Sequence, residues 1–267
     1  MNNLLNNPIN DINELIKDTI SDNNDYYFKE HLSDLFDELT IDNFNDPEFN
    51  LDKVLAEYKP YFTDYINIII YDINNYIKEI GYYSDEMIKS IKHYVIREVN
   101  LQVESKYNLY IEYYKNLYII DSLKQIKLPE QRTPEWYKMR ESMLTASSLA
   151  EAIGEGHFNT RDQLLMDKCF GIRDENPYSQ NIMGWGVKYE DVAIAVFEAR
   201  HKLHVAEFGC LPHPTLKCFG ASPDGIIDSG PMEYIGRMLE IKVPPKRVID
   251  PKNIPKHYYY QMQGQLE

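Results

Sequence analysis

Hydrophobic residues recur every three or four positions through most of the first half of the chain. This spacing runs from about Tyr27 to Leu123 and is typical of helices that bury one face. A short amphipathic helix is predicted before it, over roughly Ile9–Ile20. Pro47 and Pro60 are expected to separate helices, and Gly81 is expected to end one. The spacing is carried by Leu32, Leu35, Phe36 and Leu39, by Val54, Leu55, Tyr58, Tyr61 and Phe62, and by Met87, Ile91, Tyr94 and Val95.

The pattern changes near residues 124–133, where Pro129 and the following Pro134 disfavour a continuous helix and indicate a linker. Beyond it, helical and strand patterns alternate. Helices are predicted at Pro134–Arg140, Leu149–Ile153, Thr160–Cys169, Val187–His201 and Tyr258–Glu267, with Thr145, Ser147 and Ser148 as capping residues. Strands are predicted near Val205–Leu211, Cys218–Ser222, Gly225–Ile227 and Arg237–Val243. The predicted fold class is α+β, with a helical domain over residues 1–128 and a second domain over residues 129–267.

Composition narrows the class of protein. No apolar run reaches the roughly 18 residues of a membrane span, and the N-terminus lacks the features of a signal peptide. The chain is therefore expected to be intracellular and not bound to a membrane. Cys169, Cys210 and Cys218 are odd in number and fit no zinc-binding spacing, which favours free thiols.

The net charge of −14 is concentrated in the helical half of the chain. Residues 1–120 contain 10 Lys and Arg against 22 Asp and Glu, a net charge of −12, which leaves −2 for the remainder. The second half is therefore nearly neutral, and a cation bound to its acids would offset part of their charge. Any contact with DNA is expected to depend on local basic positions.

Candidate chemistry is concentrated in residues 222–242. Asp224 lies in a Pro-Asp-Gly turn, and Glu240 and Lys242 are two positions apart in a predicted strand, so their side chains share a face. Two carboxylates and an ammonium group on one side of a hairpin suit a hard divalent cation and a lysine that orients the attacking water. The main-chain carbonyl of Ile241 is a further candidate ligand. A hairpin with exposed acids and a salt-bridging lysine is the alternative.

Four more residues are candidates for the same site. Glu190 is expected early in a helix, where the helix dipole favours a carboxylate, and a role beside the metal is the second reading. Arg140 could bind a phosphate by a forked contact, and Ser147 could hold one at a helix start, against an ordinary surface arginine and helix cap. Gln261 shares a helix face with Tyr258 and could bind water or a phosphate.

Six motifs occur in a fixed order: W-x-x-x-R, T-A-S, W-G-x-x-Y-E, S-P-D-G, L-E-x-K-x-P and Y-x-x-Q-x-Q. Together, over about residues 133–267, they resemble the YqaJ-type viral recombinase (phage lambda exonuclease) family of the PD-(D/E)xK nuclease superfamily. The resemblance implies a large DNA virus as the source and a nuclease core with a central mixed sheet flanked by helices. It also implies Mg²⁺-dependent 5′→3′ degradation of duplex DNA ends in recombination, with Mn²⁺ as a substitute ion.

The resemblance assigns roles to these residues. Asp224, Glu240 and the Ile241 carbonyl correspond to the metal ligands and Lys242 to the catalytic lysine. Glu190 corresponds to the helix glutamate at the metal site, and Gln261 to the glutamine of the last motif. Arg140 and Ser147 correspond to residues that hold the 5′ phosphate.

The family resemblance leaves assembly and activity open in several respects. The family's toroidal assembly makes a homo-oligomer a candidate, and the helical half is a candidate site for a recombination partner. The family continues with strands and helices after the last motif, so a truncated chain or a sheet completed by another chain is expected. An endonuclease or structure-specific nuclease on the same core, and a non-catalytic module that binds DNA or a partner, are the alternatives.

Overall fold

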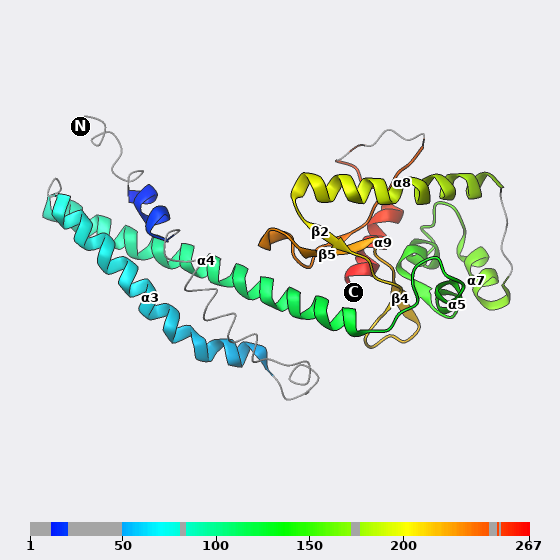
Figure 1. Cartoon of the computed structure of the whole chain (residues 1–267), viewed down its shortest axis with the longest axis horizontal. Coiled ribbons are helices and arrows are strands. Elements are labelled where there is room, and N and C mark those ends of the chain that lie inside the picture. Colours follow the sequence, from blue (N-terminus) through cyan, green and yellow to red (C-terminus); the bar gives the residue numbers. More distant parts are fainter. Residues whose placement is uncertain (1–11, 21–49, 81–83, 172–176, 246–249, 251) are drawn as a thin grey trace. The chain divides into compact units, whose positions relative to one another are not determined.

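The computed structural model describes residues 12–20, 50–80, 84–171, 177–245, 250 and 252–267 (Figure 1). The chain divides into two compact units, Met1–Lys115 and Asn116–Glu267. The domain boundary expected between residues 128 and 129 stays a prediction. No helix in the described part of the chain is both long and apolar enough to cross a membrane.

The first unit is helical in its described residues, as the apolar spacing predicts. Residues 12–20 form a helix, α3 spans Leu51–Ile80, and α4 spans Asp85–Gln125 and continues past the end of the unit. Residues four positions apart are buried on each long helix: Ile69, Ile73 and Ile77 on α3, and Val95, Val99 and Val103 on α4. The rings of Phe62 and Tyr107 join the two helices, with centroids 4.2 Å apart.

The structure corrects one expectation about the first unit. Pro60 lies inside α3 and does not separate two helices. Pro60 is exposed, while Leu55 before it and Phe62 after it are buried, so burial on both sides maintains the helix despite the missing N–H. α3 ends at Ile80, next to the expected stop at Gly81. Gly81 itself, Pro47 and the apolar residues Leu32–Leu39 lie outside the described residues.

The second unit combines short strands with helices, which confirms the α+β class. One sheet has the order β1-β4-β3 and is mixed, and the other has the order β2-β5-β6 and is antiparallel. Their bounds are Leu144–Thr145 (β1), His204–Ala206 (β2), Leu211–Pro212 (β3), Phe219–Ala221 (β4), Gly225–Ser229 (β5) and Met238–Leu239 (β6). The sheet part of the prediction is thus realised as two small sheets among the described residues.

The helices of this unit begin and end at recognisable signals. The Thr133 hydroxyl caps α5 by accepting from the Trp136 N–H at 3.3 Å, and Thr160 and Gln163 form a capping box on α7. Gly171 ends α7 in the left-handed conformation, with φ of 65°. The helices are α5 (Pro134–Glu141), η1 (Ala146–Ser148), α6 (Leu149–Ala152), α7 (Arg161–Phe170), α8 (Pro177–His201), η2 (Met232–Tyr234) and α9 (Lys256–Leu266).

Tight contacts fix α9 and the end of α4 within this unit. A Cβ on Gly264 of α9 would lie 3.0 Å from the Leu149 side chain and 3.2 Å from those of Ala146 and Phe219. Close packing of this kind needs glycine, because a neighbouring group must move to admit even one methyl. The last turns of α4 bond to the antiparallel sheet region through Asn116 Nδ2 to the Ile235 carbonyl, at 2.9 Å.

Three local expectations are wrong. Thr145 lies in β1 and makes no side-chain cap bond to η1. α8 begins ten residues before Val187, at Pro177, so the Met-Gly-Trp-Gly segment is helical. β6 ends at Leu239 and does not continue to Val243. The register of β5 and β6 would place Ile241 opposite Pro223, which has no N–H to donate, so the ladder stops there.

Candidate active site

Asp224 and Glu240 meet because their strands pair in a single register. Gly225 pairs with Leu239 and Ile226 with Met238, so the next pair at the open end is Asp224 with Glu240. The Asp224 N–H donates to the Leu239 carbonyl at 3.1 Å, which extends the ladder to this position. The two carboxylates therefore converge at the end of the β5–β6 pair, as the sequence predicts for this hairpin.

Beyond the end of the β5–β6 hydrogen-bond ladder, the Asp224 carboxylate supplies the next acceptor. Its Oδ2 accepts a hydrogen bond from the Ile241 N–H. Burial, together with the charges of Glu240 and Glu190, raises the pKa of Asp224 to about 7. The hydrogen bond from the Ile241 N–H and the charge of Lys242 act in the opposite direction. A cation bound here would be favourable, because its positive charge would stabilise the ionised form of carboxylates that otherwise resist ionisation.

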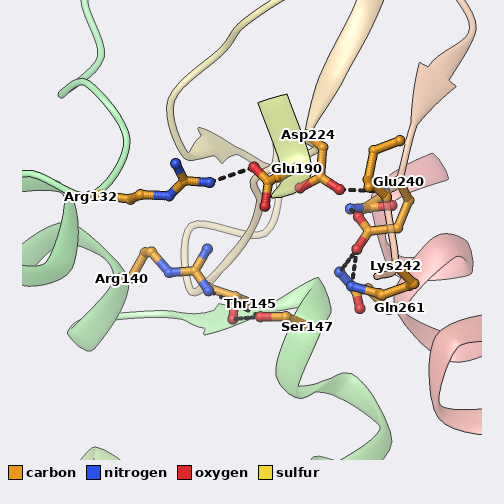
Figure 2. A network of polar contacts seen from close by, with 11 residues as sticks. Arg132, Arg140, Thr145, Ser147, Glu190, Asp224, Glu240, Lys242 and Gln261 are labelled. Atoms are coloured by element: carbon orange, nitrogen blue, oxygen red, sulfur yellow. Dashed lines mark hydrogen bonds and ion pairs between the residues drawn. The ribbon is translucent and has the colours of Figure 1, made fainter. Parts of the chain in front are cut away.

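Glu240 is held by three donors from two segments (Figure 2). Lys242 Nζ and Gln261 Nε2 donate to its Oε1, the latter at 2.7 Å, and Gln265 Nε2 donates to Oε2 at 2.6 Å. The Glu240 side chain is 9% exposed and that of Lys242 is 32% exposed. Both carboxylate oxygens are thus engaged, which fixes the orientation of the group.

Glu190 reaches the same region from α8. Its Oε1 pairs with the Nη2 of Arg132, and Figure 2 shows the Glu190 carboxylate beside Asp224. Because α8 begins at Pro177, Glu190 lies in the middle of the helix, and the expected stabilisation by an N-terminal dipole is wrong. Arg132, which the sequence analysis placed in a linker, supplies its counter-charge.

Arg140 and Ser147 form a second polar group nearby. Arg140 Nη2 donates to Ser147 Oγ at 3.0 Å, and the guanidinium lies 4.2 Å from the Trp136 ring centre. Trp136 is buried and its Nε1 donates to Ser222 Oγ at 3.3 Å. Burial lowers the pKa of Arg140, although that group stays charged at neutral pH. The structure therefore brings the two predicted phosphate-binding residues together.

The segment before α5 is fixed to the site and is not a free linker. Gln131 Nε2 donates to the Phe208 carbonyl at 2.7 Å and to the Pro223 carbonyl at 3.1 Å. Pro223 precedes Asp224, so the two bonds connect this segment directly to the turn that carries the acid. Arg132 follows at once, with φ of 65°.

The acids suit a divalent cation of the Mg²⁺ type. Mg²⁺ is commonly bound by one or two carboxylates together with substrate phosphates and water. Asp224 and Glu240 supply two such carboxylates, and the Ile241 carbonyl is next to them in the chain. Among the described residues, no three acidic, histidine or cysteine side chains converge in the arrangement of a metal site. The fit therefore depends on the pair of acids.

The fold and these contacts can now be compared with known proteins. Residues 135–267 match the YqaJ-like viral recombinase domain. This match identifies residues 135–267 as a YqaJ-like viral recombinase domain. The resemblance carried by the six motifs is thereby confirmed, and the whole candidate site except Arg132 and Gln131 lies within the matched YqaJ-like domain.

Relatives extend the comparison beyond the YqaJ-like domain. An uncharacterised protein of Acanthamoeba polyphaga mimivirus is 30% identical over 211 residues, which are 72% of this chain and 38% of that protein. The chain thus spans well under half the length of this viral relative. Among solved structures, the chain is similar to LHK-Exo, an alkaline exonuclease from Laribacter hongkongensis, at 29% identity and a TM-score of 0.40 over 50% of this chain and 67% of that one. A structure of LHK-Exo in complex with dAMP gives 28% identity and the same TM-score.

Three residues of the YqaJ-like domain and its N-terminal flank were missed by the sequence analysis: Gln131, Arg132 and Gln265. Gln265 had a usable signal, because it lies four positions after Gln261 and so shares its helix face. Gln131 and Arg132 had none, because their partners are 58 to 92 residues away in the chain.

Proposed function

We propose that this protein is a metal-dependent deoxyribonuclease that degrades DNA from duplex ends in the 5′→3′ direction during recombination. The observation that carries the proposal is the register that sets Asp224 opposite Glu240, with Lys242 bonded to Glu240. The match to the YqaJ-like viral recombinase domain supports DNA as the substrate. The mimivirus relative supports a large DNA virus as the setting.

The acids would hold Mg²⁺, with Mn²⁺ as a substitute. Asp224 and Glu240 supply the carboxylates, the Ile241 carbonyl a further oxygen, and Glu190 borders the site beside Asp224. When bound, the ion would polarise the scissile phosphate as a Lewis acid. The fixed orientation of Glu240 between Lys242, Gln261 and Gln265 serves this role, because a preorganised ligand needs no reordering on binding.

Lys242 supplies a positive charge beside the acids. Its ammonium group is bonded to Glu240 and lies 5.2 Å from the Tyr258 ring centre, so it is held near the acids and partly exposed. From there it would orient the attacking water, assist removal of its proton and offset negative charge at the phosphate. Gln261 keeps the shared partner, Glu240, in place.

Selectivity for ends would come from Arg140 and Ser147. The guanidinium is held by the Trp136 ring and by the Ser147 hydroxyl, so its fork is already ordered. A terminal 5′ phosphate offers several acceptor oxygens and more charge than an internal phosphodiester, and an arginine fork pairs with it well. In Figure 2, Arg140 comes from the opposite side of the site to Glu240 and Lys242.

The test is hydrolysis of linear duplex DNA with 5′-phosphate or 5′-hydroxyl ends, labelled at either end of one strand. Mg²⁺-dependent release from the 5′ end is expected, with loss in EDTA and in Asp224→Asn and Lys242→Ala. Arg140→Ala is expected to slow only the 5′-phosphorylated substrate. Digestion that persists in EDTA or in both site variants would refute the assignment, and cleavage of closed circular DNA would indicate an endonuclease.

A homo-oligomer and a recombination partner for residues 1–128 complete the proposal. Light scattering of the whole protein with and without duplex DNA tests the first. Pull-down of a DNA recombination protein by residues 1–128, with residues 129–267 as the control, tests the second. A monomer in both conditions, or equal retention by both fragments, would remove these two points and leave the chemistry unaffected.

A further inference from the structure

Arg132 lies beside the acids, where no motif predicts a function. Its backbone has φ of 65°, a conformation that residues with side chains seldom adopt. The residues on either side of Arg132 hold its backbone in place. Gln131, which precedes it, donates to two main-chain carbonyls, and Thr133, which follows it, caps α5. An uncommon conformation that is fixed from both sides determines the direction in which the side chain leaves the backbone.

The Arg132 side chain points toward Glu190. Arg132 pairs with Glu190 through Nη2, and its side chain remains 37% exposed. A guanidinium has several N–H donors in a planar fork, so one ion pair leaves others able to bind an oxyanion. Figure 2 shows Arg132 and Arg140 on the same side of the site, both pointing toward the carboxylates.

The negative charge of the site explains why a positively charged side chain is useful at this position. The charges of Glu190 and Glu240 both act on Asp224, and each phosphodiester that enters brings a further negative charge. Lys242 is bonded to Glu240, and Arg140 is bonded to Ser147 in the group proposed to bind the 5′ end. Arg132 is placed to compensate a phosphate next to Glu190.

We propose that Arg132 binds an internal phosphodiester of the DNA strand in the site, with Glu190 holding its guanidinium in position. The inference rests on the proposed function and deepens it by separating two phosphate contacts. Arg140 recognises the terminal 5′ phosphate, whereas Arg132 recognises the backbone whatever group ends the strand.

The experiment measures binding of a fluorescent duplex by anisotropy, with Ca²⁺ in place of Mg²⁺ to prevent hydrolysis, over a series of salt concentrations. Arg132→Ala is expected to weaken binding about tenfold and to reduce the slope of log Kd against log salt by roughly 0.7–0.9, the value for one lost phosphate contact. The loss is expected to be equal for 5′-phosphate and 5′-hydroxyl ends. Arg132→Gln serves as a second variant that removes the charge and keeps a shorter, polar side chain.

Arg200→Ala is the matched control. Arg200 is an exposed arginine on the same helix as Glu190 and lies ten residues further on, about 15 Å along the axis. The control is expected to keep the wild-type salt slope. Thermal melts of all variants establish that each is folded before binding is compared.

A cycle with Glu190→Gln separates direct contact from an indirect effect. If Arg132 touches phosphate, Arg132→Ala reduces the salt slope in both the wild-type and Glu190→Gln backgrounds. An unchanged slope in the wild-type background would overturn the phosphate contact, and an undiminished effect of Arg132→Ala in the Glu190→Gln background would overturn the positioning role of Glu190. A slope that depends on Arg132 together with no hydrolysis under any divalent cation would overturn the nuclease and leave the contact standing.

Discussion

Replacing Gln265 by leucine tests whether α9 determines the orientation of Glu240. The substitution keeps a side chain of similar size and removes the donor that lies 2.6 Å from Glu240 Oε2. The Glu240 side chain is only 9% exposed, so water cannot fully replace the lost bond. A hydrogen bond to a charged group contributes about 1.5–3 kcal/mol, and we expect the free energy of unfolding to fall by that amount.

Chemical denaturation in urea measures this change, and Mg²⁺-dependent hydrolysis measures its effect on the site. Since about 1.4 kcal/mol corresponds to a tenfold change, we expect turnover to fall about tenfold or more if the orientation of Glu240 is needed at the transition state. Gln263→Leu is the control, because Gln263 is exposed on the same helix and bonds to no group of the site. Equal losses in stability for Gln263→Leu and Gln265→Leu would refute the reasoning.

Two further predictions concern the metal ligands and the packing of α9. Asp224→Asn is expected to abolish Mg²⁺ binding in calorimetry, whereas Lys242→Met should retain binding and lose about 100-fold or more in turnover; equal loss of metal binding by both would contradict separate roles. Gly264→Ala should lower the free energy of unfolding by about 1–3 kcal/mol, because the new methyl would lie 3.0 Å from Leu149. Gly184→Ala, on α8 with no atom within 4 Å of the new methyl, should raise it by about 0.5–1 kcal/mol, and a matching loss at Gly184 would contradict the packing argument.

The sequence predicts the centre of the candidate site because its geometry is local. Asp224, Glu240 and Lys242 lie within one hairpin, where a short connection limits how two strands can pair. The alternation of side chains was the wrong reason for grouping Glu240 with Lys242, since β6 ends at Leu239. Their contact survives because Lys242 is long enough to bond to Glu240 from an irregular segment.

The parts that sequence reasoning missed depend on packing between distant segments. Nothing near Arg132 in the chain indicates that Glu190, 58 residues later, is its partner. The start of α8 was missed because Gly184 and Gly186 are poor helix formers, and a helix through them was not expected. The expectation that Pro60 separates two helices failed for a similar reason. Burial of residues on either side of it outweighs the local cost of a proline inside a helix.

The dependence of Glu240 on α9 has a consequence for synthesis of the protein on the ribosome. Lys242 is translated 23 residues before Gln265, a delay of roughly 1–5 s at about 5–20 residues per second. During that interval the nascent chain contains the acids and Lys242 but not the helix whose amides orient Glu240. For the proposed nuclease, this order of synthesis predicts no activity toward nearby DNA until α9 has emerged and docked.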